Sequence, residues 1–324
     1  MTTLIALSAI AGFLDTPSKG FTDWQTALAG KKSVSATVTI NEVGGVTSSY
    51  KIDMKKPASL RLETTEETIV ADGTNITVFS KKDNVFYKKP QTAEELKVTL
   101  NEDQYAMFSG FFGSAPKVVK TVDAGSRTLG GEPVNEVKAF FDKSGKKTTS
   151  FFVSPDGVAR RANLTAEAKG QSKPKQLVFS AKNVVIDGAA VDTLFAFKAP
   201  TGSTEMSYED FFGSRWVYDF DEAMMIAKKT NKGIFVDFMA SWCGPCKMMA
   251  ATAFDTPEFK AFGKKVVFCQ IDIDLNPALA EKYGVEAIPN VFVLKSDGTK
   301  VGSILGWSGL STFMSKMDGL VNSL

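Results

Sequence analysis

Histidine is absent from this chain of 324 residues, and cysteine occurs only three times. Without histidine the chain has neither a Ser-His-Asp nor a Cys-His catalytic group, and it lacks the commonest side-chain ligand of transition metals. Three cysteines are too few for a disulfide-rich scaffold, a four-ligand zinc site or an iron-sulfur cluster. We therefore expect no bound metal or other cofactor, and any proton transfer must use carboxylates, lysines, tyrosines, thiols or water.

A strong excess of charge is also missing, because the formal net charge is only +2. A near-neutral chain gives no electrostatic reason to expect a nucleic-acid partner. Two lysine-rich stretches, 142–149 and 170–176, lie between strand-like segments, where solvated turns explain them more simply than phosphate binding does. The length, by contrast, is ample for about two domains.

Long apolar runs are missing as well. The apolar segment Leu4–Leu14 is too short to cross a bilayer. It has the length of the apolar core of a secretory leader, and the Ala-Ile-Ala at 9–11 resembles a cleavage site, but no basic residue precedes it. Residues 1–19 are therefore either a leader segment or an ordinary first helix.

Residues 20–200 alternate between polar and apolar side chains in the way that is typical of an antiparallel β domain. Turn signals such as Asp72-Gly73 and Asp156-Gly157 separate the strand-like segments. The expected strands are centred on 35–40, 49–54, 59–64, 74–79, 84–88, 134–141, 147–153, 159–168 and 174–185. One face of such a sheet is apolar and needs a cover.

Two stretches between these strands could supply that cover. Thr92 and Glu95 have the spacing of a capping box at the start of a helix over 92–100. Residues 104–113, QYAMFSGFFG, are apolar and aromatic. Two interpretations of this stretch stay open, a plain core helix and a lid over an apolar groove.

Residues 201–211 follow Pro200 and contain Gly202. This composition is typical of a linker, so we expect one here. Over 212–324 the pattern changes to alternating helices and strands. Asp219, with Glu222 three residues later, is the expected start of the first helix. The expected order is helix, strand, helix, strand, helix, strand, strand, helix, which predicts a separate α/β domain.

A nearly continuous apolar strand leads into residues 240–250, ASWCGPCKMMA. The cysteine pair could carry out redox chemistry, bind a metal or only staple the fold, and the scarcity of other ligands disfavours the metal. At a helix start, free backbone N–H groups and the helix dipole would stabilise a thiolate at Cys243 and lower its pKa. Cys243 would then open a substrate disulfide, and Cys246 would resolve the mixed disulfide. Pro245 fits the first helical turn, where no N–H is needed.

Two further residues near this pair have patterns that need an explanation. Asp237 lies within the apolar strand, where an isolated carboxylate is costly without a partner or a function. Below the cysteines its pKa would be raised and it could accept the proton of Cys246, whereas a surface-facing aspartate at the strand edge is the plainer alternative. A cis Ile288–Pro289 bond would leave the Ile288 backbone free to pair with an extended substrate. The plainer alternative is an ordinary trans proline at the start of a strand, with no role in substrate binding.

With these motifs identified, residues 212–324 closely resemble thioredoxin. The sequence VDFMASWCGPCK at 236–247 matches the active-site strand and helix start of that family, and 271–298 matches the stretch through its cis-proline. The stretch 252–262 is more similar to the C-terminal domains of envelope thiol reductases. The resemblance covers about a third of the chain and implies a thioredoxin fold.

The resemblance also implies a role for each matching residue. It gives the nucleophile, the resolving thiol and the buried acid as Cys243, Cys246 and Asp237. It gives the residues that support the site or line the substrate groove as Trp242, Gly244, Pro245, Ile288, Pro289 and Gly306. One position departs from the family, because Gln270 stands where a lysine often lies beside the buried aspartate. The third cysteine, Cys269, is interpreted as a small core residue, with a third redox role as the alternative.

The front part of the chain has no catalytic motif, but 54–90 and 197–206 are similar to the outer-membrane lipoprotein carrier family. That similarity implies a half-open antiparallel barrel with helices over its mouth. It also implies a lipid or lipoprotein as ligand of the front domain, and an envelope location. No individual ligand residue can be carried over.

The leading hypothesis is a thiol-disulfide oxidoreductase of the cell envelope. The Gly-Pro dipeptide favours a disulfide reductase, with a potential on the order of −270 mV. Its expected partners are disulfide-containing proteins and a thiol electron donor such as a membrane reductase. An oxidase or isomerase, a lipid or lipoprotein carrier with an accessory thioredoxin module, and an adaptor whose pair stays oxidised are the alternatives. An extracytoplasmic location in the periplasm or envelope is favoured, and the cytoplasm stays open.

Overall fold

The computed structural model describes residues 16–43, 45, 47–101, 103–167, 174–189, 191–213 and 215–324. Most of the candidate leader at 1–19 lies outside the described residues, as does much of the lysine-rich stretch 170–176. The chain divides into two compact units, which we call the front unit and the thioredoxin unit. The front unit is built from residues before 203, apart from short pieces that include 85–88, and the thioredoxin unit is built mainly from 203–324.

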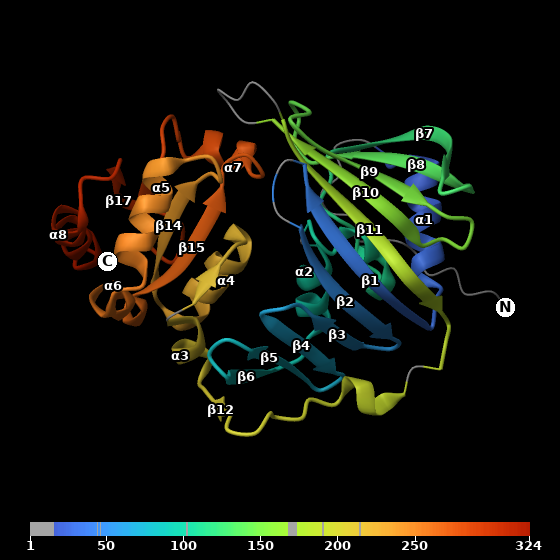
Figure 1. Cartoon of the computed structure of the whole chain (residues 1–324), viewed down its shortest axis with the longest axis horizontal. Coiled ribbons are helices and arrows are strands. Elements are labelled where there is room, and N and C mark those ends of the chain that lie inside the picture. Colours follow the sequence, from blue (N-terminus) through green and yellow to red (C-terminus); the bar gives the residue numbers. More distant parts are fainter. Residues whose placement is uncertain are drawn as a thin grey trace. The chain divides into compact units, whose positions relative to one another are not determined.

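The front unit is dominated by a large sheet (Figure 1). Within the front unit its strand order is β5-β4-β3-β2-β1-β11-β10-β9-β8-β7. The strands are β1 Ser33–Glu42, β2 Thr47–Lys55, β3 Ser59–Glu63, β4 Glu67–Asp72, β5 Asn75–Ser80, β7 Lys120–Leu129, β8 Glu132–Phe140, β9 Lys147–Val153, β10 Ala159–Ala166 and β11 Lys175–Ile186. Two more strands, β6 Val85–Pro90 and β12 Thr204–Glu205, consist mostly or entirely of residues that group with the thioredoxin unit. All the expected strands are present, and β4, β7 and β12 are additional. The half-open barrel stays a prediction.

Among the described residues, four helical segments belong to the front unit: the α-helices α1 Lys19–Ala29 and α2 Ala93–Asn101, and the 3-10 helices η1 Ala106–Phe112 and η2 Asp192–Phe195. The capping box at α2 is formed, because Thr92 Oγ1 accepts from the Glu95 N–H and Glu95 accepts from the Thr92 N–H. Helix α1 was not expected from the alternating pattern. It packs an apolar face on the sheet, and the Trp24 ring lies 4.6 Å from the Phe151 ring of β9.

The aromatic stretch 104–113 is core rather than an exposed lid. The side chains of Tyr105, Phe108 and Phe111 are at most 4% exposed. The rings of Tyr50 and Tyr105 are 5.0 Å apart, and the Tyr50 hydroxyl donates to the Gln104 carbonyl. The side of β2 that carries Tyr50 is therefore the side that the η1 segment covers, and these aromatics fill the core instead of lining a groove.

The thioredoxin unit has a five-stranded sheet in the order β13-β15-β14-β16-β17. Its elements are α3 Tyr208–Gly213, β13 Trp216–Val217, α4 Phe220–Thr230, β14 Gly233–Met239, α5 Gly244–Met249, η3 Ala250–Phe254, α6 Pro257–Ala261, η4 Phe262–Lys264, β15 Val266–Asp272, α7 Pro277–Lys282, β16 Asn290–Leu294, β17 Lys300–Leu305 and α8 Leu310–Val321. The predicted thioredoxin fold is confirmed. Helix α4 begins as expected, with Asp219 accepting from the Glu222 N–H.

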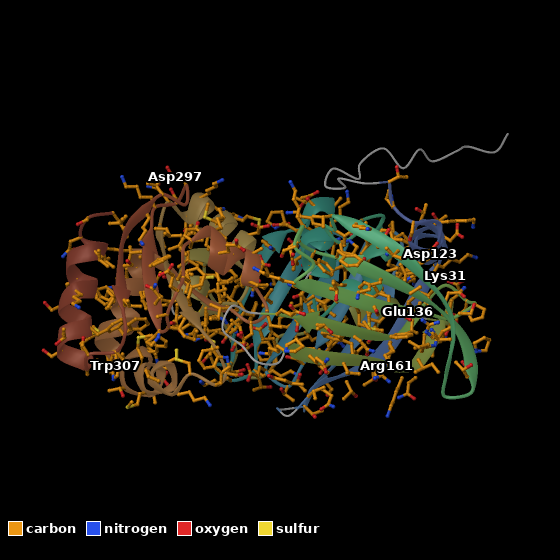
Figure 2. All side chains as sticks on the ribbon, turned by 90° about the horizontal axis from the view of Figure 1, so that it is seen from above. Lys31, Asp123, Glu136, Arg161, Asp297 and Trp307 are labelled. Carbon is orange, nitrogen blue, oxygen red and sulfur yellow. A yellow bond between two sulfur atoms is a disulfide. The ribbon has the colours of Figure 1, made fainter. Side chains whose placement is uncertain are left out.

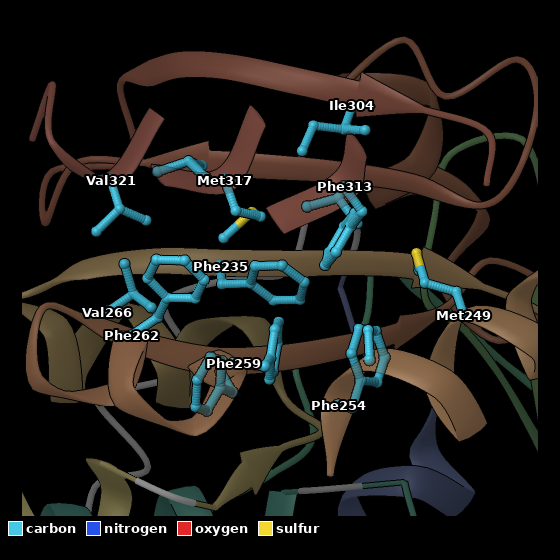
Figure 3. Packing of buried hydrophobic residues seen from close by; sticks show 14 residues of the cluster. Phe235, Met249, Phe254, Phe259, Phe262, Val266, Ile304, Phe313, Met317 and Val321 are labelled. Carbon is cyan, nitrogen blue, oxygen red and sulfur yellow. The ribbon is translucent and has the colours of Figure 1, made fainter. Parts of the chain in front are cut away.

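Strand β14 lies at the centre of this unit and is covered on both faces. Phe235 belongs to an aromatic cluster on one face, together with Phe259, Phe313 and other apolar residues (Figure 3). Val236 belongs to the cluster on the opposite face. Because side chains alternate along a strand, Asp237 points to the same face as Phe235, the face that carries Met249 of α5.

The segment 201–211, expected to be a linker, contains the two-residue strand β12 and the first half of α3. It is followed directly by the thioredoxin elements. Among the described residues, no helix combines the length and the apolar character that a membrane crossing requires.

Candidate redox site

The cysteine pair lies where β14 passes into α5. Cys243 is the N-cap residue of α5, and its sulfur accepts a hydrogen bond from the Cys246 backbone N–H at 3.1 Å. Pro245 occupies the first turn of the helix, where a missing N–H costs nothing. The two cysteines form a disulfide with their Cα atoms 5.3 Å apart. The pair is therefore closed in its oxidised state, with a backbone donor already directed at the first sulfur.

Both cysteines are shielded by apolar neighbours. Cys243 is 3% exposed and Cys246 is 2% exposed, and both pack with Ala240. Ile288, one of the residues expected at the substrate groove, packs against the same cluster. In contrast, Gly244 and Pro245 between the cysteines are exposed. The turn between the cysteines is therefore open to solvent, while the two cysteines themselves are shielded.

Asp237, the expected acid of the site, is buried in β14 and only 1% exposed. Burial raises its pKa to about 7, although the hydrogen bond from Gln270 lowers it in part. The Gln270 side-chain amide donates to Asp237 Oδ2 at 3.0 Å, and the two residues are direct partners across β14 and β15. The other oxygen, Oδ1, has no hydrogen-bond partner among the described residues. An acid of this kind can exchange a proton near neutral pH.

The proline and the glycine that were expected beside the pair lie next to each other. The Ile288–Pro289 bond is cis, and Pro289 is buried. The Gly306 N–H donates to the Pro289 carbonyl at 2.8 Å. Strand β16 begins only at Asn290, so the Ile288 peptide lies outside its ladder. Gly306 has a φ of 77°, and a side chain there would meet open space rather than protein, which leaves room for a ligand.

Trp242 is 52% exposed beside the cysteines, and its indole N–H donates to Asp274 Oδ2 at 2.8 Å. Asp274, which is 5% exposed and follows the end of β15, was not expected at the site. The signal for it is not local, because it comes from the parallel strands β14 and β15, whose carboxyl ends meet at one edge of the sheet. Asp274 therefore fixes the orientation of the indole ring.

Cys269 takes no part in this arrangement. It is fully buried in β15 within the apolar cluster on the far side of the sheet from Phe235. Burial raises its pKa well above the ordinary value, so its reactive thiolate is disfavoured. Within the described part of the chain, no cluster of three or more acidic or cysteine side chains could hold a metal ion.

A known protein family matches the part of the chain that contains this site. The model of the thioredoxin family matches residues 218–318. The chain is 40% identical over 91 residues to a thioredoxin H-type of Oryza sativa, a match that covers 27% of this chain and 69% of that protein. It is 35% identical over 95 residues to a thioredoxin of Mycobacterium tuberculosis, covering 29% and 79% respectively. Among solved structures, the oxidised C-terminal domain of Neisseria meningitidis DsbD is 31% identical with a TM-score of 0.29, covering 32% of this chain and 98% of that one.

Proposed function

Because the chain belongs to the thioredoxin family and is a thiol-disulfide oxidoreductase, we propose that it is a reductase that opens disulfides in protein substrates. The observation that carries this proposal is the Cys243–Cys246 disulfide at the start of α5, the helix that follows the strand containing the buried Asp237. The Gly-Pro dipeptide between the cysteines favours reduction as the net direction.

The reaction begins from the dithiol form. The Cys243 thiolate attacks one sulfur of the substrate disulfide, whose S–S bond breaks, and the other substrate sulfur leaves as a thiolate that takes a proton from water. Cys243 is then joined to the substrate in a mixed disulfide. The Cys246 N–H, which donates to the Cys243 sulfur in the oxidised form, would stabilise negative charge on that sulfur.

The second step closes the pair. Asp237 accepts the proton of the Cys246 thiol, and the Cys246 sulfur attacks Cys243, which breaks the mixed disulfide. The substrate is released with both of its sulfurs reduced, and Cys243 and Cys246 end the reaction joined in a disulfide. A dithiol donor must then supply two electrons and two protons to restore the starting form.

We assign substrate binding to the surface beside the pair. An extended substrate segment would pair with the backbone of Ile288 and pass over Pro289 and Gly306. The position of Ile288 outside the β16 ladder and the open space at Gly306 support this assignment. The exposed ring of Trp242 would provide apolar contact.

We further propose that the protein works in the cell envelope, outside the cytoplasm, with a membrane reductase as its electron donor. The front unit would recruit a substrate, a lipid or a lipoprotein. The support is the similarity of 54–90 and 197–206 to the lipoprotein carrier family. Native mass spectrometry of the protein purified from its own organism tests the lipid part, since a carrier would retain lipid of defined mass.

Two experiments test the redox proposal. In the first, purified protein with dithiothreitol as donor should reduce the disulfides of insulin, and Cys243→Ser should abolish this turnover. The matched control is Cys269→Ser, which removes a thiol that lies outside the site and should keep full activity. Loss of activity in both variants, or in neither, would contradict the assignment of the nucleophile.

In the second experiment, Cys246→Ser is expressed in the organism of origin and its disulfide-linked partners are identified. Removal of the resolving thiol should leave the mixed disulfide intact. Capture of secreted or envelope proteins would support the proposed compartment. Capture of cytoplasmic proteins alone would refute it, while leaving the oxidoreductase activity unaffected.

A further inference from the structure

The front unit contains an open groove of about 560 Å³ that none of the redox chemistry uses. One wall is formed by residues of β2 to β5, and the other is formed by Thr193, Leu194, Ala196, Phe197, Lys198 and Pro200. Leu60 and Leu62 of β3 are buried in the core, so the alternating Arg61 and Glu63 point to the opposite face of the sheet. The groove therefore lies on the face away from α1, α2 and η1. Its volume is within the range of small-molecule sites.

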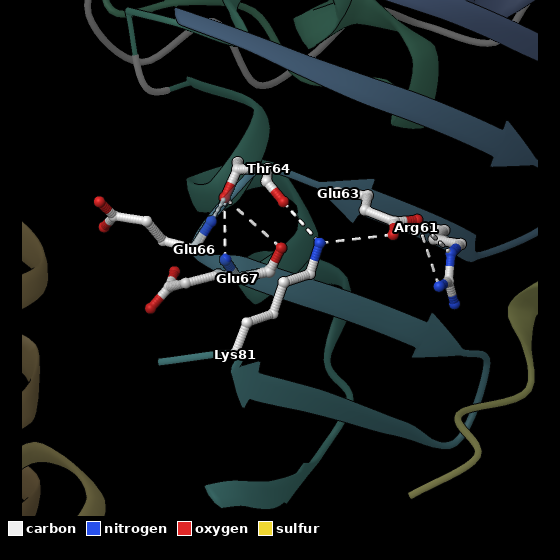
Figure 4. Close-up of polar contacts among 6 residues, drawn as sticks. All are labelled: Arg61, Glu63, Thr64, Glu66, Glu67 and Lys81. Atoms are coloured by element: carbon white, nitrogen blue, oxygen red, sulfur yellow. Dashed lines mark hydrogen bonds and ion pairs between the residues drawn. The ribbon is translucent and has the colours of Figure 1, made fainter. Parts of the chain in front are cut away.

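Positive charge is in excess along this groove. Four cations line it, Lys51, Arg61, Lys81 and Lys198, against a single carboxylate, Glu63. Arg61 and Lys81 share that carboxylate, at 3.3 Å and 3.4 Å from its oxygens (Figure 4). Lys51 is neutralised by Asp53, at 3.0 Å. Within the described residues Lys198 has no ion-pair partner, so two positive charges remain uncompensated.

The shared carboxylate is held in its ionised form. Burial alone would raise the pKa of Glu63, but Arg61 and Lys81 outweigh burial and lower it. The two cations are held in place, because Lys81 also donates to the Thr64 carbonyl at 2.6 Å and the Arg61 side chain is only 24% exposed. Arg61 and Lys81 thus form a preorganised pair of donors with one negative charge between them.

An apolar strip runs beside the charges. Phe79 of β5 is 7% exposed, and its ring lies 6.0 Å from the ring of Phe197. Leu194 and Pro200 complete the strip on the same wall as Phe197. The segment that carries them is anchored independently of the groove, by the buried Phe195 and by an ion pair between Lys55 and Asp192.

We propose that this groove binds a small organic anion, one whose carboxylate or phosphate is held by Arg61 and Lys81 and whose apolar part lies on Phe79 and Phe197. Bidentate contact from a guanidinium and a point charge from an ammonium suit both kinds of acidic group. The uncompensated positive charge requires the ligand to be anionic. The aromatic strip requires an apolar part of limited size, such as a ring or a short chain. The site does not depend on the cysteine pair or on the proposed reductase function.

The test is a titration of the full chain, in its oxidised form, with matched probes followed by calorimetry. Octanoate and octyl phosphate carry the proposed head and tail, octyl glucoside carries the tail without charge, and acetate and inorganic phosphate carry the heads without a tail. We expect at least one charged octyl probe to bind ten-fold more tightly than octyl glucoside and than its own head group. A preference for octanoate or for octyl phosphate identifies the acidic group. Higher salt should weaken only the charged probes.

Three variants locate the site. Arg61→Gln with Lys81→Gln should weaken the charged octyl probe at least ten-fold and leave octyl glucoside unchanged. Glu63→Gln removes the competing carboxylate and should tighten the same probe several-fold, a gain that an unfolded variant cannot give. Phe197→Ser should reduce binding of the octyl probe toward that of the bare head group.

The matched control is a double variant of two cations on the same sheet outside the groove, Lys138→Gln with Arg161→Gln. Arg161 lies on β10 (Figure 2) and bonds Asn163 rather than the groove residues. This control should bind the probes as the wild type does. Equal binding of charged and neutral octyl probes, or equal losses in the control and in the Arg61/Lys81 variant, would overturn the proposal.

Discussion

Each unit has a carboxylate on its sheet, and the pKa values of the two carboxylates are shifted in opposite directions. In the front unit, Glu63 lies between two cations, and its pKa is lowered. In the thioredoxin unit, Asp237 faces the neutral amide of Gln270, and its pKa is raised to about 7. Glu63 is partly exposed, whereas Asp237 is almost fully buried. The charge of the neighbour and the degree of burial, not the residue type, decide which carboxylate can exchange protons at neutral pH.

The opposite shifts have opposite consequences for stability. Asp237 has a raised pKa in the fold, so its contribution to stability is fully present below its ordinary pKa of 3.8 and is lost as pH rises toward about 7. Glu63 has a lowered pKa, so its contribution is present above its ordinary pKa of 4.5 and is lost as the pH falls.

The largest expected effect is on catalysis. Asp237→Asn removes the proton acceptor for Cys246 and should slow resolution of the mixed disulfide on the order of 10²-fold at pH 7.5. Rapid-mixing kinetics with a disulfide peptide measures this step. Glu63→Gln is the matched control and should leave the rate within two-fold of the wild type. Equal rates for the wild type and Asp237→Asn would show that Asp237 does not act as the base.

Asp237 and Glu63 should also differ in how they change the free energy of unfolding as the pH rises. Between pH 5 and pH 8 the wild type should lose roughly 2–3 kcal/mol that Asp237→Asn does not lose, because only the wild type must ionise a buried group. Urea unfolding of both proteins at the two pH values measures the difference. Glu63→Gln should follow the wild type over this range, since Glu63 is ionised throughout. A wild type whose stability does not fall relative to Asp237→Asn would place the pKa of Asp237 well below 7.

A smaller effect should follow from changing the neighbour of the buried acid. Gln270→Lys would give Asp237 the kind of partner that Glu63 has, and should lower its pKa by about one unit. The pH at which the resolution rate rises should fall by the same amount. Gln270→Leu removes a hydrogen bond that lowers the pKa, and should shift the profile in the other direction. Profiles that do not move in opposite directions would contradict the role given to Gln270.

The smallest effect concerns the orientation of Trp242. Trp242→Phe keeps an apolar ring but removes the donor to Asp274, a single hydrogen bond that contributes about 1 kcal/mol. We expect a loss of about three-fold in kcat/KM for insulin, with kcat nearly unchanged. A loss in kcat alone would assign the ring to the chemical step instead of to substrate binding.

The local geometry around the cysteine pair could be expected from the sequence, because the residues involved are close together or belong to matching motifs. The cysteines, Pro245 and the start of α5 lie within a few residues of each other, so their geometry follows from helix capping. The resemblance to thioredoxin led us to expect Gln270 beside Asp237, and the two are partners across β14 and β15. The bond from Trp242 to Asp274 was missed, because no local pattern joins an indole to a carboxylate 32 residues away.

The front unit was harder to predict because its features depend on distant segments. Alternation predicted most of its strands, but it did not predict α1, whose apolar face is defined only once the sheet is in place. The sequence left two interpretations of the aromatics of 104–113 open, core or lid, and their burial supports the core. The groove that exists depends on a segment near residue 195 that lies over strands formed more than a hundred residues earlier.

The central claim is that Cys243 attacks the substrate and Cys246 resolves the intermediate. The most direct test is mass spectrometry of Cys246→Ser and Cys243→Ser, each reduced, mixed with one purified disulfide protein and then quenched with acid. We predict a stable mixed disulfide only for Cys246→Ser, with the substrate joined to Cys243. A stable adduct at Cys246 in the Cys243→Ser variant, or one at Cys269 in either, would contradict the account.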